Sequence, residues 1–382
     1  MDNLTHSLVG LTLAKAGLDR LTPAATTVSI LAANAPDSDV VVGLFADRWT
    51  LLHHHRGITH SIVGTICLAL VLPLLVYAID RLIARWRGRR PATQLRGLLL
   101  VSLIATATHP FLDWLNNYGV RPLLPFDSRW FYGDLLYIVD PFMWLFLGGA
   151  SFLLTAQTKM QKIFWAALAI ILSWMIAFGP GRRADISNPN FLIALWFGVV
   201  VMLVLLSVLK AGKRWGTRIA IGGLTLVAVY WIGLSVTHRQ AVSIATNQAN
   251  SIASQYQESV ARLAVMPTLA NPFRWDSTFE TNGATYRFRL GLLENVGTID
   301  RLVRYPKPEG ELAAAIQQIS EDRRLKIFLD FARFPVARLQ DSACTEQTLV
   351  QFADLRYTEP GRQRAGFTIE LPVDCRSLRT SR

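Results

Sequence analysis

Long apolar runs alternate with short polar segments over the first 236 residues of the chain. Six runs reach the roughly 20 residues that a helix needs to cross a bilayer. Two shorter apolar stretches, 4–18 and 24–35, precede them and predict a helical hairpin that is either partly inserted or buried among the other helices. The pattern predicts a mainly α, polytopic membrane bundle of about six spans plus this hairpin. The six runs are 61–83, 97–115, 137–157, 163–179, 191–209 and 218–236.

The pattern changes after residue 236. Residues 237–264 carry apolar side chains at helical spacing and predict a connecting helix that leaves the membrane. Residues 286–290 and 367–371 alternate with the period of half-buried strands, and 309–324 has helical spacing between them. We therefore predict a membrane-embedded domain over 1–236, a connecting helix over 237–264, and a small soluble α+β domain over 265–382.

Composition supports this division. Of the 382 residues 51% are hydrophobic and only 17% are charged, against about 25% charged in soluble domains. The net charge of +12 does not indicate nucleic-acid binding, because much of it lies in short loops between apolar runs. Three cysteines are too few for a disulfide scaffold. Cys67 lies in an apolar run, whereas Cys344 and Cys375 are predicted to pair if the soluble domain faces an oxidising compartment.

Lysine and arginine are unevenly distributed between the two predicted sides of the membrane. Loops 84–96, 158–162 and 210–218 carry eleven cations on one side, and the other side carries six. The positive-inside rule places the eleven in the cytoplasm. The chain is then a multi-pass membrane protein. Residues 36–60, 116–136 and everything after 236 are predicted to lie outside the cytoplasm.

Histidine and aspartate gather where the apolar runs meet one membrane face. Six of the seven histidines fall within the first 109 residues. His109 and Asp113 are four residues apart, so both side chains share one helix face. With antiparallel helices His6, Asp37 and His60 also fall at this face. Ionisable groups at membrane depth are costly, which makes function their default interpretation. A lone histidine there is more often a hydrogen-bonded interfacial residue, but the whole set favours a metal site.

Imidazole and carboxylate ligands suit a divalent transition metal, with zinc expected first and manganese or iron as alternatives. An ion with an open coordination position would activate a water for attack on a phosphoester, with Asp39 as the base. Arg56, followed by Gly57, is expected to hold a phosphate bidentately, unless it is simply an interfacial cation. Thr59 is expected to cap the helix that starts near His60.

Segment 116–140 is a weaker candidate. Its aromatic residues suit an interfacial belt. Its acidic residues either join the site or are ordinary turn residues, and Asp140 before Pro141 has the position of a helix N-cap. Neither a nucleophile elbow nor a Walker motif occurs in the sequence. A transporter would need polar residues along a whole bundle axis, and runs 163–179 and 191–209 contain almost none.

Several motifs together resemble the YdjM family of bacterial inner-membrane proteins. They are the N-terminal MDNLTHSLVG, NAPDSD at 34–39, HHRGITHS at 54–61, HPFLDW at 109–114 and WFYGD at 130–134. The resemblance covers about residues 1–240. It implies a metal-dependent hydrolase, and some members are described as LexA-regulated or LexA-binding. A more distant likeness is to zinc-dependent phospholipases C, which use a similar order of ligands. By that likeness Asp37, His60, His109 and Asp113 hold one metal, and His6 helps to hold a second that Asp113 bridges. The downstream histidines of those enzymes are missing here.

The sequence thus leads to two expectations. The first is a metal-dependent hydrolase at the periplasmic membrane face, which acts on a phosphoester that we expect to be lipid-linked. Its expected partner is membrane lipid, and no nucleic-acid partner is expected. The second is a non-enzymatic membrane protein with a structural metal site and a C-terminal domain that binds a protein partner. A vacant coordination position favours the first, and a closed four-ligand site favours the second.

Overall fold

The computed structural model describes residues 1–179, 189–293, 299–341, 346–362 and 367–375. By its contacts the chain divides into two compact units. The first comprises 1–38, 56–236 and 267–272, and the second comprises 39–55, 237–266 and 273–382. The fold is a helical membrane part with a small α+β part, as predicted.

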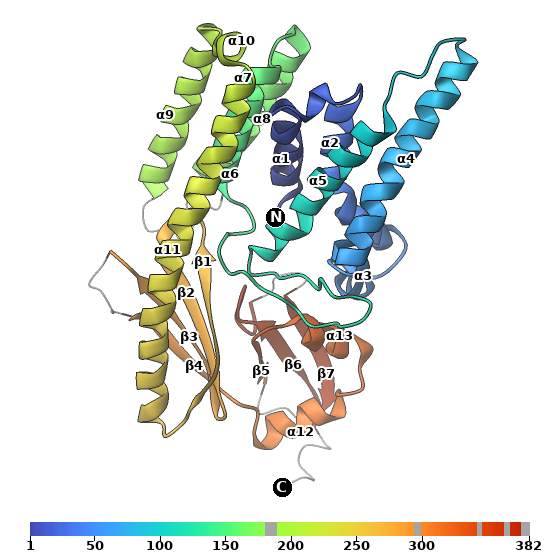
Figure 1. Ribbon diagram of the computed structural model, residues 1–382. Helices are drawn as coiled ribbons and strands as arrows, with labels where there is room; N and C mark the ends of the chain where they lie inside the picture. Colours follow the sequence, from blue (N-terminus) through green and yellow to red (C-terminus); the bar gives the residue numbers. More distant parts are fainter. Residues whose placement is uncertain (180–188, 294–298, 342–345, 363–366, 376–382) are drawn as a thin grey trace. The chain divides into compact units, whose positions relative to one another are not determined.

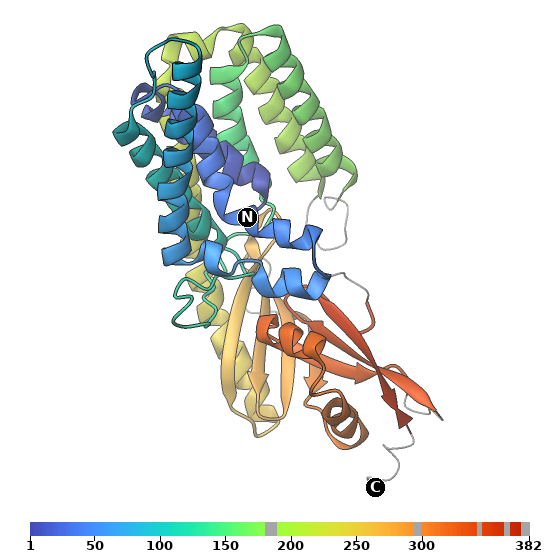
Figure 2. The ribbon, with the colours of Figure 1, turned by 90° about the vertical axis from the view of Figure 1, so that its right-hand side faces the viewer.

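The predicted N-terminal hairpin is present. It consists of α1 (Asn3–Lys15) and α2 (Ala25–Asn34), joined through the short η1 (Leu18–Arg20). Asp2 caps α1 by accepting a hydrogen bond from the Thr5 backbone amide. The two helices approach closely at Gly10, where a Cβ would lie 2.6 Å from the Ser29 carbonyl oxygen. Ser29 Oγ donates to the Gly10 carbonyl at 2.7 Å. Figures 1 and 2 show this hairpin beside α4 (Ile62–Trp86) and α5 (Leu95–Trp114).

Five helices in the described part of the chain are long and apolar enough to cross a membrane. Large apolar side chains such as Leu70 and Leu75 on α4 are exposed, as lipid-facing residues are in a membrane helix. The predicted run 137–157 instead forms a shorter helix over Pro141–Thr155, which Asp140 caps. It consists of α6 (Pro141–Met143), the π-helical η4 (Trp144–Gly148) and α7 (Gly149–Thr155). The five long helices are α4, α5, α8 (Lys159–Phe178), α9 (Pro189–Val208) and α11 (Thr217–Gln255); α10 (Ala211–Trp215) joins the last two.

The second unit contains two antiparallel sheets. The first has the order β1-β2-β3-β4, and residues 237–255 of α11 pack on it through Ala245 and Ala249 against Trp275 and Phe279. The second has the order β5-β6-β7 and packs against α12 (Gly310–Gln318) and α13 (Arg323–Phe331). The predicted strands are confirmed, and the helical segment predicted over 309–324 is present but ends at Gln318, before α13 begins at Arg323. The strands are β1 (Val260–Thr268), β2 (Asn271–Thr281), β3 (Ala284–Gly291), β4 (Ile299–Pro306), β5 (Pro335–Leu339), β6 (Gln347–Asp354) and β7 (Thr368–Asp374).

Residues 39–55 fold with the second unit although they lie early in the sequence. They include most of η2 (Ala35–Leu44) and all of α3 (Arg48–His54). Trp49 is only 6% exposed and belongs to the same apolar cluster as Leu325 and Phe328 of α13. Arg323 Nη2 donates to Thr50 Oγ1 at 2.6 Å. The unit therefore differs from the predicted 265–382 domain, because it takes this loop and begins its first strand at Val260.

The cysteines follow the expected division as far as the structure describes them. Cys67 is free and exposed on α4. Cys375 is disulfide-bonded. Cys344, the remaining cysteine of the sequence, lies outside the described residues.

Candidate metal centre

Four side chains from three helical regions converge at one end of the first unit. Asp37 follows α2, and His60 ends η3 (Ile58–His60) directly before α4. His109 and Asp113 lie in the last two turns of α5, one helical turn apart on the same face. One ligand atom from each of the four lies within 4.8 Å of every other. The group can hold a metal ion, and the antiparallel course of the helices brings its members together.

The separations of these atoms match the size of a cation site. Asp37 Oδ1 lies 3.4 Å from His60 Nε2 and 3.4 Å from His109 Nε2. Asp113 Oδ2 lies 3.4 and 3.6 Å from the same two nitrogens, which are 3.1 Å apart. Tetrahedral ligands about 2.0–2.1 Å from zinc lie about 3.4 Å from one another. The donor set fits a divalent transition metal. Zinc, manganese and iron all accept imidazole and carboxylate.

Both imidazoles are oriented through their far nitrogens. His109 Nδ1 lies 2.7 Å from the Ala33 carbonyl oxygen, so it donates there and leaves Nε2 with a free lone pair. His60 Nδ1 lies 3.1 Å from Thr59 Oγ1. Such outer partners fix the tautomer and the ring orientation of metal-binding histidines. The predicted cap at Thr59 is not found. Ser61 caps α4 by accepting from the Gly64 amide, because the 58–60 turn places Thr59 beside the imidazole.

His6 lies directly beside the four-residue group. Its ring stacks on that of His109 with centroids 3.7 Å apart. His6 Nε2 lies 3.5 Å from Asp113 Oδ1, the carboxylate oxygen that does not face His60. The His6 side chain is fully buried, and neither ring nitrogen has a hydrogen-bond partner among the described residues. The Met1 amino group contacts the same Asp113 oxygen.

Arg56 compensates the charge of Asp113. It is 3% exposed, and its Nη2 donates to Asp113 Oδ1 at 3.0 Å. Its Nη1 donates to Asn116 Oδ1 and the Gly119 carbonyl, both at 3.1 Å. The guanidinium also lies 4.4 Å from the centre of the Tyr118 ring. Arg56 was predicted as a phosphate-binding residue, and the structure places it against the carboxylate and the end of α5.

Asp37 is ionised in this setting. Burial by itself raises the pKa of its carboxyl group. Without a cation, the hydrogen bonds and positive charge that His109 and His60 supply when protonated outweigh that effect and hold the pKa well below its usual range. An ionised carboxylate is the form that ligates a cation.

Other predicted residues lie elsewhere. Asp39 belongs to the second unit, where its Oδ1 lies 3.1 Å from His55 Nδ1. Asp127 pairs with Arg129 at 2.7 Å. Asp140 caps α6 and accepts a hydrogen bond from the Tyr230 hydroxyl at 2.8 Å, so its N-cap interpretation is confirmed.

Sequence reasoning missed some contributors. The Ala33 carbonyl gives no sequence signal, because any residue supplies one. Asn116 Oδ1 accepts a hydrogen bond from Arg56, a contact for which the sequence carries no signal. The sequence did carry a signal for the Arg56–Asp113 pair. The predicted cluster contains two carboxylates and two neutral bases, and Arg56 is a cation close to it in the sequence.

Two comparisons with known proteins gave a match to this chain. Residues 1–184 match the family model described as YdjM inner membrane protein, which includes the whole four-residue group. The uncharacterized protein YfhP of Bacillus subtilis (strain 168) is 24% identical over 372 residues, covering 94% of this chain and 88% of YfhP. That similarity extends over both compact units. No solved structure matches the chain.

Proposed function

From the match of residues 1–184 to the family model of the YdjM inner membrane protein, we propose that the chain is a membrane-bound, metal-dependent hydrolase of phosphoesters. One observation carries the proposal. Two buried histidine nitrogens lie 3.1 Å apart, and each lies 3.4–3.6 Å from an oxygen of Asp37 and an oxygen of Asp113, at the end of a membrane helical bundle. Buried ionisable groups in a membrane protein are costly, so an arrangement with this spacing supports a functional cation.

We assign roles to the chain's own residues as follows. Asp37, His60, His109 and Asp113 hold the cation, and His6 adds a fifth donor on the Asp113 side. When bound, a divalent cation supplies Lewis acidity for attack of water on a phosphoester. Zinc is the first choice of metal, ahead of manganese and iron. Arg56 keeps Asp113 ionised and oriented.

Asp39 is the proposed general base. It follows the ligand Asp37 by two residues, and its carboxylate lies 3.1 Å from His55 Nδ1. A carboxylate paired with an imidazole can take up a proton and pass it on.

The location of the substrate follows from the position of the site. The ligands lie where α4 begins and α5 ends. The site is therefore at a membrane face and not at mid-membrane depth. Phosphoesters of lipid headgroups occur at that depth, which supports a lipid-linked substrate. The positive-inside distribution and the disulfide-bonded Cys375 both support a multi-pass inner-membrane protein whose site and C-terminal unit face the periplasm.

A structural metal site is the second candidate. The four-ligand set is complete in itself, and His60, His109 and Asp113 are at most 1% exposed. A closed set of four ligands is typical of structural zinc. The cation would then join α2, α4 and α5 without chemistry, and the C-terminal unit would bind a protein partner.

Metal content and hydrolysis, measured on the same detergent-purified full-length protein, test both candidates. Wild type is compared with the His109→Ala/Asp113→Ala double variant and with a control, His54→Ala/Asp127→Ala, which changes the same residue types outside the cluster. We expect near-stoichiometric metal in wild type and control and loss of it in the double variant. Hydrolysis of phospholipids or soluble phosphoesters should follow the metal.

The outcomes separate the candidates. Metal that is lost in the double variant, with no hydrolysis of any phosphoester, supports the structural site and rejects the hydrolase. Absence of metal from wild type, even after reconstitution with zinc, manganese or iron, rejects both.

A further inference from the structure

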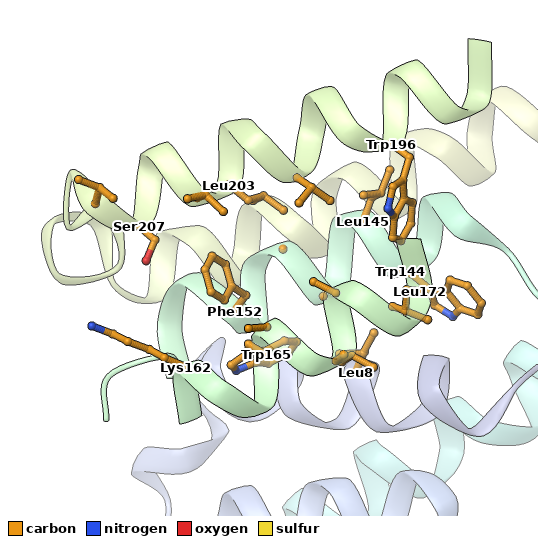
Figure 3. Close-up of a pocket in the computed structure, with 18 residues that line it drawn as sticks. Leu8, Trp144, Leu145, Phe152, Lys162, Trp165, Leu172, Trp196, Leu203 and Ser207 are labelled. Carbon is orange, nitrogen blue, oxygen red and sulfur yellow. The ribbon is translucent and has the colours of Figure 1, made fainter. Parts of the chain in front are cut away.

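An apolar cavity of about 420 Å³ lies in the first unit, apart from the His/Asp group. Helices α7, α8 and α9 form most of its wall, and Leu8 of α1 closes part of one end. Figure 3 shows Lys162 and Ser207 at the other end, with Phe152 and Trp165 between the two ends. Its volume falls in the range of ligand pockets, about 300–1,000 Å³.

Three tryptophans line the cavity, and their indole nitrogens donate hydrogen bonds to groups outside it. Trp144 Nε1 donates to Asp2 Oδ1 at 3.1 Å, and Trp165 Nε1 donates to Thr155 Oγ1 at 2.9 Å. Trp196 Nε1 donates to Ser173 Oγ at 2.9 Å. None of these acceptors lines the cavity. The indoles therefore offer hydrocarbon to an occupant, and a water inside would lack the two to four polar partners it needs.

Small residues keep the cavity open along the helices. Gly148 and Gly149 line it on one side, and Ala166 and Ala169 line it on α8. The lining residues of α8 extend from Lys162 to Leu172, which are ten positions apart, or about 15 Å at the helical rise. One leaflet contributes about half of the roughly 30 Å hydrocarbon core. The cavity thus has the length and chemistry of a single acyl chain.

The end with Lys162 is strongly cationic. Lys159 and Lys162 begin α8, and Lys210, Lys213 and Arg214 lie at α10, which contacts α7 and α9. Apart from Asp185, which lies outside the described residues, the sequence 141–236 contains no acidic residue. Each cation near a membrane surface attracts anionic headgroups by about 1 kcal/mol.

We propose that this cavity binds one acyl chain of an anionic phospholipid and that Lys162 pairs with the phosphate of its headgroup. Lys162 lies at the start of α8, and the His/Asp group lies at the opposite ends of the helices, where α5 ends and α4 begins. The bound lipid belongs to the other leaflet. It is a resident lipid and not the substrate in the proposed function, so the inference stands independently of hydrolysis.

Native mass spectrometry of the detergent-solubilised full-length protein tests this site. The protein is delipidated and then titrated with dioleoylphosphatidylglycerol or dioleoylphosphatidylcholine. We expect one retained lipid with a preference for the anionic one, and a loss of that preference of about fivefold in Lys162→Ala. Lys159→Ala, which removes a cation of the same helix that does not line the cavity, should keep the preference.

A second pair of variants tests the acyl chain. Ala169→Phe fills the cavity and should lower occupancy by both lipids, whereas Ala167→Phe on the exposed side of α8 should not. Thermal unfolding shows whether each variant is folded, and phosphatidylglycerol should raise the Tm of wild type more than that of Ala169→Phe. Equal binding by wild type, Lys162→Ala and Ala169→Phe would overturn the proposal. Retention of a free fatty acid in place of a phospholipid would overturn it too.

Discussion

The Thr59 hydroxyl group contacts the far nitrogen of the His60 ring. Thr59 Oγ1 lies 3.1 Å from His60 Nδ1. His109 has a backbone carbonyl in the equivalent place, which no side-chain substitution can remove. A side-chain substitution can therefore remove the outer partner of His60 while leaving all metal ligands in place, but it cannot do so for His109.

Thr59→Val replaces this hydroxyl with a methyl group of similar size. We expect the affinity for zinc to fall by about ten- to a hundredfold, the usual effect of losing an outer partner of a metal ligand. Competition with a chromophoric chelator measures it on the purified protein. Thr108→Val is the matched control, because its hydroxyl donates to the Ala105 carbonyl of its own helix. Equal zinc affinity in Thr59→Val and Thr108→Val would remove Thr59 from the site.

Asp276 gives the second unit a pH-dependent stability. It is paired across the β2–β3 ladder with Arg289, whose Nε donates to Asp276 Oδ1 at 2.6 Å, and Arg287 adds a contact at 3.3 Å. Burial raises the pKa of Asp276, but the hydrogen bond from Arg289 and the charges of both arginines lower it further, so the net pKa lies below its usual value.

The sign of the effect follows from that direction. A carboxyl group with a lowered pKa stabilises the folded state above its unfolded pKa, about 3.9. The stabilisation is lost as the pH falls below that value through the folded pKa. Asp276→Asn should therefore cost about 1 kcal/mol at pH 7, and progressively less as the pH falls through the folded-state pKa of Asp276. Hydrogen exchange of the β2 and β3 amides against pH measures it. Asp300→Asn, at an exposed pair in the same sheet, should be nearly neutral, and an equal effect of both variants would contradict the assignment.

At the scale of elements, the periodicity of apolar residues and the spacing of the histidines and aspartates predicted much of the fold and of the site. The i, i+4 spacing fixes His109 and Asp113 on one face of α5 wherever that helix packs. Asp37 and His60 join them because successive membrane helices alternate in direction, which the lengths of the apolar runs reveal. The alternating strands β3 and β7 were likewise readable from the sequence.

What could not be predicted depends on tertiary contacts. Hydropathy reports that 137–157 is apolar, but the cap at Asp140 and the end at Thr155 shorten the helix to Pro141–Thr155. The π-helical turn at Trp144–Gly148 has no local signature. Residues 39–55 look like a polar loop of the membrane part, and only the burial of Trp49 reveals that they fold with the second unit.

Helix α3 should therefore contribute to the stability of the second unit. Trp49→Ala removes a side chain that is 6% exposed in the cluster with Leu325 and Phe328, and such truncations cost about 3–5 kcal/mol. We expect faster hydrogen exchange in α13 and in the β5–β7 sheet. Phe45→Ala is the control, because Phe45 lies in the same segment but is 85% exposed. Unchanged exchange of α13 in Trp49→Ala would show that α3 does not stabilise the unit.

At the scale of the whole molecule, the short helix over Pro141–Thr155 decides on which side the C-terminal unit lies. Segment 116–140 and the chain after Val236 share a side if α6–α7, α8, α9 and α11 all cross, which makes four crossings. Fifteen residues cover only about 22 Å, less than the roughly 30 Å hydrocarbon core. Without this crossing the two segments would lie on opposite sides. The disulfide-bonded Cys375 favours four crossings, since disulfides persist in oxidising compartments.

Reporter fusions test the number of crossings. Alkaline phosphatase, which needs an oxidising compartment, should be active when fused after residue 382. A green fluorescent protein fused at the same position reports a cytoplasmic location by its fluorescence, and it should stay dark. The same reporters fused after Arg90, in the cation-rich loop 84–96, should give the reverse, because the positive-inside rule holds that loop in the cytoplasm. If both positions give an inactive phosphatase and a fluorescent reporter, the Pro141–Thr155 helix does not cross. The C-terminal unit would then share the compartment of loop 84–96, on the side opposite to the His/Asp group, and residues 39–55 could not fold with it as they do in the structure.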